Sequence, residues 1–327
     1  MQPLYLNCIG GKSILHEIVD EGIHSTERFL PSSLFREKVK KTIQFTLKQI
    51  DKNLLIYRDL FPAPASKNGF YGAVKNEGWT ASFWTGMLWL AYELTSDKKY
   101  RDAAEIQLKS FQSRLEKNIS METHDIGFLY TLSCVAATKL TKNTEARRTA
   151  IKAANRLLGR YLQKAGIIQA WGSLSDPKTS GCMIIDCLMN LPLLYWASEE
   201  SGDRKYAEAA YQHAKSTAQY IVRPDASTYH TFYMDIETGK PKYGKTRQGY
   251  SDTSCWSRGQ AWSIYGFSLS YAYTKDPAFL DIAGKTANYF LNRLPKDNIC
   301  CWDLIFTDDS TKRDSSAAAI AVCGLLQ

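Results

Sequence analysis

Two kinds of helical segment alternate along the chain, one rich in charged residues and one largely apolar. The charged segments, which are expected to expose one face to solvent, lie near 34–52, 98–116, 144–163, 204–221 and 277–293. The apolar segments, which are expected to be buried, lie near 80–95, 126–139, 184–199, 257–273 and 314–326. Five outer–inner pairs favour an all-α fold, the (α/α)6 toroid of helical hairpins, in which inner helices ring a central cavity. Six pairs close such a ring, so we expect a final pair of about 40 to 90 residues to be missing after Gln327.

A loose repeat marks the starts of the charged helices. An Asp is followed by an aromatic residue three positions later and by Ala six or seven positions later, as in Asp97, Tyr100 and Ala103. The pattern recurs from Asp203 and Asp276, and a weaker copy starts at Asn143. The Asp is expected to cap each helix, while Ala allows close packing of neighbouring helices.

Unusual residues gather at the N-terminal ends of the apolar segments. Since the inner helices of a toroid run in the same direction, these ends are expected to share one mouth, and core packing alone does not require polar groups there. The residues are Trp79, Thr80 and Trp84; His124 and Asp125; Asp186; Trp256, Arg258 and Trp262; and Asp314, Ser315 and Ser316.

Two of these residues are carboxylates inside apolar stretches. Asp186 lies in an otherwise apolar run from Met183 to Met189, and Asp125 opens a second apolar segment. Burying an unpaired carboxylate costs several kcal/mol, so such a group is paired, protonated or functional. Two half-buried carboxylates at helix starts indicate acid/base chemistry on a sugar. The alternative is that each one is an N-terminal helix cap.

Composition narrows the possible functions. The 327 residues include 8 Trp, 19 Tyr and 13 Phe, which suits sugar stacking but also ordinary cores. The formal net charge of +8 is spread over amphipathic helices without a basic arm, so no nucleic-acid partner is expected, whereas an anionic substrate could be attracted. The eight cysteines form no CxxC pair, which disfavours structural zinc. Without a secretory signal or an apolar run of about 20 residues, we expect a cytoplasmic protein with no membrane partner.

Three motifs resemble a known family, the unsaturated glucuronyl hydrolases of glycoside hydrolase family 88. They are Asn76–Met87 (NEGWTASFWTGM), His124–Phe128 (HDIGF) and Ser257–Trp262 (SRGQAW). The resemblance runs from about residue 34 to the end, so we expect a catalytic domain over 34–327, and an extension of unknown role over 1–33. It implies a six-hairpin α/α toroid that cleaves the unsaturated uronic acid left by polysaccharide lyases. Some members of the family hold a substrate sulfate in the part that is expected to be missing here.

The resemblance also implies roles for individual residues. Asp186 matches the general acid/base of the family, and Asp125 matches the carboxylate that assists it. The positions expected to line the substrate pocket are Trp79, His230, Gln248, Arg258 and Trp262.

The chemistry of the substrate requires a particular protonation state of Asp186. The C4=C5 bond of the unsaturated uronate is a vinyl ether, which is hydrated by protonation at C4 and addition of water at C5. Asp186 must therefore be protonated at rest, and apolar Ile184, Ile185 and Leu188, together with an ionised Asp125, are expected to raise its pKa. This reaction requires no cofactor and no metal.

Structural alternatives stand beside several binding roles. Arg258 suits a uronate because its guanidinium fork binds carboxylates bidentately, but a salt bridge to Asp125 or Asp252 is the alternative. Taken alone, His230 is more often a structural histidine than a ligand-binding one. Three further expectations concern side chains near the mouth: Gln248 could hydrogen-bond a sugar hydroxyl, Trp84 and Trp256 are expected in the core, and Ser315 and Ser316 are expected to cap the last helix.

Competing functions remain open from the sequence. The sister family that acts on unsaturated rhamnogalacturonan fragments shares the toroid and the chemistry. An inverting toroid glycosidase would instead use two carboxylates on a saturated sugar. A truncated, inactive sugar-binding toroid is the non-enzymatic reading. The expected partners are unsaturated uronic-acid-containing disaccharides or oligosaccharides, and a homo-oligomer is possible.

Overall fold

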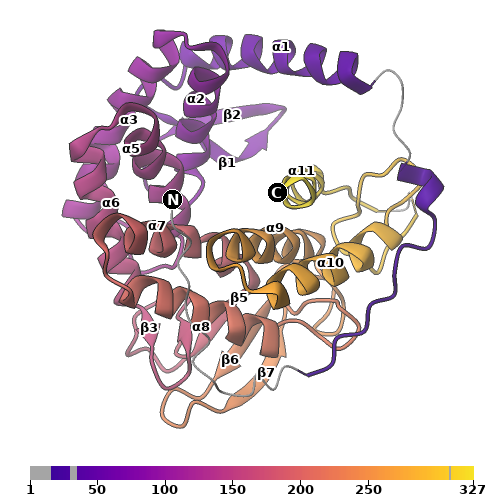
Figure 1. Ribbon diagram of the computed structural model, residues 1–327. Helices are drawn as coiled ribbons and strands as arrows, with labels where there is room; N and C mark the ends of the chain where they lie inside the picture. The colour runs from indigo at the N-terminus through magenta and orange to yellow at the C-terminus, as the bar shows by residue number, and fades with distance from the viewer. Residues whose placement is uncertain (1–15, 30–34, 309–310) are drawn as a thin grey trace. The chain divides into compact units, whose positions relative to one another are not determined.

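The computed structural model describes residues 16–29, 35–308 and 311–327, and the chain divides into two compact units (Figure 1). The smaller unit comprises residues 27–156, and the larger comprises 157–327 together with the N-terminal segment up to Thr26. Each unit is described separately below. The predicted extension over 1–33 lies largely outside the described residues.

The smaller unit consists of helices with one β-hairpin. The hairpin pairs its strands antiparallel, with Phe61 opposite Val74, around a turn at Asn68 and Gly69, which both have positive φ angles. Its elements, after the short 3₁₀-helix η1 (Thr26–Phe29), are α1 (Phe35–Leu54), β1 (Phe61–Lys67), β2 (Phe70–Val74), α2 (Ala81–Thr95), α3 (Lys98–Glu116), α4 (Ile126–Tyr130), η2 (Thr131–Val135), α5 (Ala136–Thr141) and α6 (Thr144–Leu158).

The larger unit combines helices with two small antiparallel sheets, one of two strands (β3–β4) and one of three (β5–β6–β7). Its elements are β3 (Tyr161–Leu162), β4 (Ile167–Ile168), β5 (Cys182–Ile184), η3 (Ile185–Met189), α7 (Leu191–Ser201), α8 (Lys205–Tyr220), β6 (Thr231–Met234), β7 (Pro241–Lys245), α9 (Ser257–Thr274), α10 (Pro277–Asn292) and α11 (Ser315–Leu326).

The helices agree with the predicted alternation, apart from three inner segments. The segment predicted to be buried at 314–326 forms α11, of which only Ala317, Ala321 and Gly324 are buried. The segment predicted at 126–139 is interrupted by a π-helical turn, η2, between α4 and α5. The segment predicted at 184–199 begins as strand β5 and a 3₁₀ turn, and α7 starts only at Leu191. A short apolar run has no period that separates a strand from a buried helix, which explains the error at 184–199.

The predicted capping repeat is confirmed at Asp97 and Asp276, which are the N-caps of α3 and α10, whereas the N-cap of α8 is Arg204 and Asp203 lies one residue before it. The side chains of Asp97, Asp203 and Asp276 each accept a hydrogen bond from the backbone N–H two residues later, at 3.0–3.1 Å. The aromatic residues of the three copies are buried, as are their alanines. At the weaker copy, the side chain of Asn143 accepts from Ala146 N at 2.9 Å.

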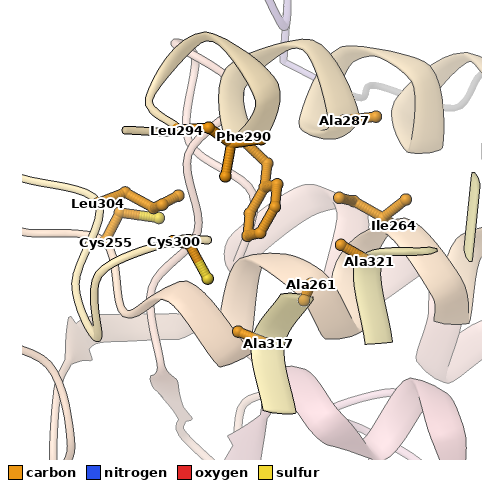
Figure 2. Packing of buried hydrophobic residues seen from close by; sticks show 10 residues of the cluster. All are labelled: Cys255, Ala261, Ile264, Ala287, Phe290, Leu294, Cys300, Leu304, Ala317 and Ala321. Atoms are coloured by element: carbon orange, nitrogen blue, oxygen red, sulfur yellow. The ribbon is translucent and has the colours of Figure 1, made fainter. Parts of the chain in front are cut away.

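One core of the larger unit lies between α9, α10 and α11 (Figure 2). Phe290 projects from α10 toward Ile264 of α9, and alanines of α11 face the same cluster. Small residues there let the helices approach closely, because a Cβ on Gly324 would lie 2.7 Å from the backbone of Tyr265. This packing supports α9, whose first turn carries Arg258.

The N-terminal segment is fastened to residues that follow α8 and α10 in the larger unit. Val19 N donates to Pro224 O at 2.7 Å, and the Arg293 guanidinium binds the Glu21 carboxylate, with the shorter contact at 2.6 Å. This ion pair lowers the pKa of Glu21 against the opposing effect of burial. In the described parts of the chain, no helix combines the length and the apolarity that crossing a bilayer requires.

Candidate active site

Asp186 stands where a strand turns into a helix in the larger unit. Strand β5 pairs with β6, with Ile184 opposite Thr231, and Ile185 N donates to His230 O at 3.1 Å. The chain then enters η3, where Asp186 is partly exposed between fully buried Ile185 and Cys187. The N-cap of η3 is Ile184, and no side chain caps it. The capping alternative for Asp186 is therefore wrong.

Two glycines of α9 allow η3 to lie against that helix. A Cβ on Gly259 would meet the Ile185 side chain at 3.2 Å, and a Cβ on Gly266 would lie only 2.3 Å from the Cβ of Leu188. Any side chain at Gly266 would therefore displace η3 and, with it, Asp186. Sequence analysis missed both residues, because a helical glycine reveals its packing role only when its neighbour is known.

His230 is buried immediately before strand β6. Its ring lies 4.6 Å from that of Trp256, and its Nδ1 accepts a hydrogen bond from Arg247 N at 2.9 Å. Burial, followed by the charges of Arg247 and Arg258, lowers the pKa of His230 to about 4. The imidazole is therefore neutral near pH 7, and since Nδ1 is the acceptor, Nε2 carries the proton.

Arg258 lies over Trp256 and binds side chains on both sides. Its Cζ is 4.5 Å from the indole centroid, and Nη1 lies 3.2 Å from Asp314 Oδ2. Nη2 donates to Gln248 Oε1 at 3.0 Å, which brings two of the predicted binding residues together. The alternative of a salt bridge to Asp252 is wrong, since that carboxylate accepts from Thr246 N and Arg258 pairs with Asp314.

Asp314 also caps the last helix, α11, by accepting from Ala317 N at 2.9 Å. The expectation that Ser315 and Ser316 supply this cap is therefore wrong. Ser316 instead accepts a hydrogen bond from Arg258 Nη1 at 3.1 Å and donates to Asp314. Asp314 thus links the start of α11 to that of α9.

A fully buried carboxylate, Asp303, holds the loop that carries Gln248. It accepts hydrogen bonds from Tyr250 N at 2.8 Å, from Ser254 Oγ at 2.7 Å and from Ile305 N at 3.1 Å. Sequence analysis missed this residue, although it shares the signal of Asp186, a lone carboxylate between apolar neighbours. Here the hydrogen bonds satisfy the carboxylate, so its role is structural.

The tryptophans divide by exposure. Trp256 of the larger unit and Trp84 of the smaller one are buried, which confirms their assignment to the core. Trp84 Nε1 donates to Tyr57 O at 2.9 Å, whereas Trp79 is 38% exposed. Trp262, a predicted pocket residue, is only 4% exposed.

In the smaller unit, Trp79 rests on a cluster of aromatic rings. Its ring lies 5.8 Å from Phe83 and 5.5 Å from Phe128, which follows Asp125 by three residues. The exposed part of the indole is therefore fixed in place and free to stack on a sugar ring.

Asp125 is partly exposed beside a buried histidine. Its Oδ1 lies 3.5 Å from His124 Nε2, and its Oδ2 accepts a hydrogen bond from Thr123 Oγ1 at 2.8 Å. Although Asp125 occupies the N-cap position of α4, its side chain makes no capping hydrogen bond. The capping alternative is therefore wrong here too, and neighbouring side chains orient the carboxylate.

Arg114 positions the loops that precede both Trp79 and Asp125. It is 2% exposed, and its guanidinium donates to Gly78 O at 2.7 Å, to Glu77 O at 3.1 Å and, through Nε, to Ile119 O at 3.1 Å. Sequence analysis missed it, because it lies in the charged helix α3, where arginines are expected to face solvent.

Comparison with known proteins identifies the family. The model of Glycosyl Hydrolase Family 88 matches residues 63–327. A curated relative from Streptococcus pneumoniae, an unsaturated chondroitin disaccharide hydrolase, is 46% identical over 95% of this chain and 79% of its own length.

Solved structures agree. The crystal structure of unsaturated glucuronyl hydrolase from Streptococcus agalactiae has a TM-score of 0.92 at 45% identity, over 95% of this chain and 79% of that one. A variant of that enzyme in complex with dGlcA-GalNAc6S has a TM-score of 0.83 at 42% identity, over 95% of this chain and 78% of that one. The predicted fold class, an all-α toroid of helical hairpins, is confirmed by this likeness, although short strands accompany the helices. The chain belongs to glycoside hydrolase family 88, the unsaturated glucuronyl hydrolases, as the three motifs predicted.

Proposed function

We propose that this chain releases the unsaturated (4,5-ene) uronic acid from the non-reducing end of lyase-generated glycosaminoglycan oligosaccharides. The names of its relatives, chondroitin disaccharide hydrolase and glucuronyl hydrolase, favour this substrate class over rhamnogalacturonan fragments. The observation that carries the proposal is the position of Asp186, a partly exposed carboxylate in a buried turn that is hydrogen-bonded to the backbone of His230.

In the proposed reaction, Asp186 acts first as an acid and then as a base. Its carboxyl proton adds to C4, and positive charge develops on C5 and the ring oxygen. Water then adds at C5 and returns a proton to the Asp186 carboxylate. The resulting hemiketal opens, which releases the rest of the sugar without attack at the anomeric carbon. The proposal requires Asp186 to be protonated at rest, and its neighbours Ile185 and Cys187 are both buried.

Other side chains supply binding and orientation in this proposal. Arg258, Gln248 and the Nε2–H of His230 offer donors to the uronate and its hydroxyl groups, while Trp79 offers a stacking face. Asp125 assists Asp186. Trp262 remains a proposed pocket residue, although only 4% of it is exposed.

The first experiment follows the ultraviolet absorbance of the conjugated uronate in unsaturated chondroitin, hyaluronan, heparin and rhamnogalacturonan disaccharides. Loss of absorbance with glycosaminoglycan substrates, and slower or no loss with rhamnogalacturonan, is expected. Faster turnover of the rhamnogalacturonan disaccharide would instead support the alternative function, hydrolysis of unsaturated rhamnogalacturonan fragments. Binding without loss of absorbance from any substrate would support the sugar-binding alternative.

The acid/base role is tested by Asp186→Asn. We expect turnover to fall by about 10²–10⁴ with folding intact, because the amide cannot transfer the proton. Asp281→Asn, at an exposed position on α10, is the matched control and is expected to keep full activity. Near-normal turnover by Asp186→Asn would refute the assignment.

Two further expectations belong to this proposal. We infer a cytoplasmic location, which cell fractionation would test. A homo-oligomer remains a prediction, and light scattering of the purified chain measures its mass directly.

A further inference from the structure

Three aromatic side chains of the larger unit form a cluster at the surface to which no role has been assigned. They are Tyr250, in the loop after β7, and Trp302 and Phe306, in the segment between α10 and α11. The centroid of the Tyr250 ring lies 5.2 Å from that of Phe306 and 6.5 Å from that of Trp302, and the last two lie 6.0 Å apart. Tyr250 is 61% exposed, and the other two residues are partly exposed. Clustered aromatic rings at a surface mark a site of interaction, because apolar area is costly to leave in water.

Hydrogen bonds fix the backbone that carries these rings. Asp303 accepts from Tyr250 N at 2.8 Å through its buried carboxylate and from Phe306 N at 3.2 Å through its backbone carbonyl. One residue therefore holds both segments of the cluster. The indole of Trp302 is oriented by its own hydrogen bond, from Nε1 to Thr311 Oγ1 at 3.1 Å. The rings are preorganised, so a ligand that stacks on them has few further groups to order.

The aromatic cluster is continuous with the proposed substrate site through two backbone connections. Tyr250 follows Gln248 by two residues, so their Cα atoms are at most about 7.6 Å apart. Ser257 N donates to Trp302 O at 3.2 Å, and Ser257 immediately precedes Arg258 in the first turn of α9. Gln248 and Arg258 are proposed to bind the terminal sugar. The cluster therefore adjoins the backbone of both of these residues.

We propose that Tyr250, Trp302 and Phe306 form a stacking site for the sugar rings that follow the unsaturated uronic acid in substrates longer than a disaccharide. This inference rests on the proposed function. The uronic acid is the terminal sugar of an oligosaccharide, so the remaining sugars lie over the surface beside the residues that hold it. The apolar C–H faces of sugar rings stack on aromatic rings.

The surroundings of the cluster suit a carbohydrate. The hydroxyl groups of Ser251 and Thr253 lie 3.1 Å apart in the loop that carries Tyr250, where they can exchange hydrogen bonds with sugar hydroxyls. The cluster is too small to bind a second copy of the chain by itself, because a stable protein interface buries about 800 Å² on each partner. One or two sugar rings match three aromatic side chains in size.

The test compares the full chain with Tyr250→Ala, Tyr250→Phe and Phe306→Ala. Tyr271→Ala is the matched control, because Tyr271 is also a surface tyrosine but lies near the far end of α9, roughly 20 Å from Arg258 along the helix. The probes are the unsaturated hyaluronan disaccharide and tetrasaccharide, neither of which carries sulfate. For each we measure kcat/KM by loss of absorbance, and Kd by calorimetry with the Asp186→Asn variant as background.

In Tyr250→Ala and in Phe306→Ala, we expect the ratio of kcat/KM for the tetrasaccharide to that for the disaccharide to fall about fivefold, mainly through KM, because a stacking face is lost. The Kd of the tetrasaccharide should rise in parallel. Tyr250→Phe should retain most of the ratio, since the ring remains, and Tyr271→Ala should retain all of it.

Equal losses on the two substrates would overturn the inference while leaving the proposed function intact, since the rings would then serve only to hold the loop of Gln248. An unchanged ratio in both Ala variants would overturn it as well. If light scattering then showed that Tyr250→Ala dissociates a dimer, the cluster would belong to an interface between copies of the chain. If the unmodified chain hydrates neither substrate, the proposed function fails, and the inference fails with it.

Discussion

Arg114 in the smaller unit and Arg258 in the larger unit hold opposite kinds of partner. Arg114 is buried and directs most of its donors to backbone carbonyls, among them those of Glu77, Gly78 and Ile119. Arg258 is partly exposed, and within the part of the chain that the structure describes it hydrogen-bonds only side chains, those of Asp314, Ser316 and Gln248. One guanidinium fixes loop geometry, while the other is held by groups that can rotate away.

The difference teaches how to separate a structural arginine from a binding one. Backbone carbonyls cannot leave without moving the chain, so removing Arg114 would leave several partly buried acceptors without a donor. Side-chain partners can exchange for a ligand carboxylate at smaller cost, because the displaced groups reach water. The structure around Arg258 therefore tolerates substitution better than its proposed function does.

The largest expected effect is on stability and concerns the structural arginine, Arg114. Arg114→Met should lower the free energy of unfolding by about 3–5 kcal/mol, since it breaks a buried charged network. Denaturant unfolding followed by fluorescence measures this, with Lys109→Met, exposed on the same helix, as a control that should change little. Equal stability of the two variants would show that the Arg114 network is dispensable.

For Arg258 we expect a large loss of activity and a small loss of stability. Arg258→Met should reduce kcat/KM on the preferred disaccharide about a hundredfold, because a charged hydrogen-bonding fork to the uronate is lost. Its unfolding free energy should fall by only about 1 kcal/mol, as for other partly exposed ion pairs. Arg148→Met, at an exposed position on α6, is the activity control. A large loss of stability with full activity would remove the distinction between the two arginines.

Acidification should lower the free energy of unfolding, because His230, which lies near Arg258, is neutral in the folded chain. The pKa of His230 is depressed to about 4, so between pH 6.5 and 4 the unfolded chain binds more protons than the folded one. The contribution is constant well above pH 6.5, and stability falls through this window as pH decreases, by on the order of 3 kcal/mol.

Comparing His230→Gln with the unmodified chain isolates this effect. The glutamine side-chain oxygen can still accept from Arg247 N, but it does not titrate. The stability difference between the two proteins should therefore change across the window and remain flat above it. A pH-independent difference would contradict the buried, neutral histidine.

The smallest effect concerns a device that both units share. Asp97→Ala in the smaller unit and Asp276→Ala in the larger one should each cost about 1 kcal/mol, because each removes an N-terminal helix cap. Asp97→Asn and Asp276→Asn should recover most of the loss. Denaturant unfolding measures both losses. If the two Ala substitutions lower the free energy of unfolding by different amounts, the capping Asp makes a further stabilising contact in one of the units.

Local patterns in the sequence were sufficient to predict most helices. Amphipathic periodicity and Asp caps depend on residues within one or two turns, and for that reason α3, α8 and α10 begin close to where the repeat places them. The three motifs identified the family for the same reason, since each is a short continuous string. Asp186 was recognisable as unusual because its neighbours in the chain are apolar.

Contacts between distant residues were decided only by the tertiary structure. Arg114 meets Gly78 across 36 positions and Arg258 meets Asp314 across 56, so no local pattern could assign either partner. The burial of Trp262 and His230, and the short strands β5, β6 and β7, likewise depend on what packs against them. Local sequence patterns were thus sufficient to identify the candidate residues. Their environment is determined by desolvation and by long-range hydrogen bonds, which exist only once the chain has folded.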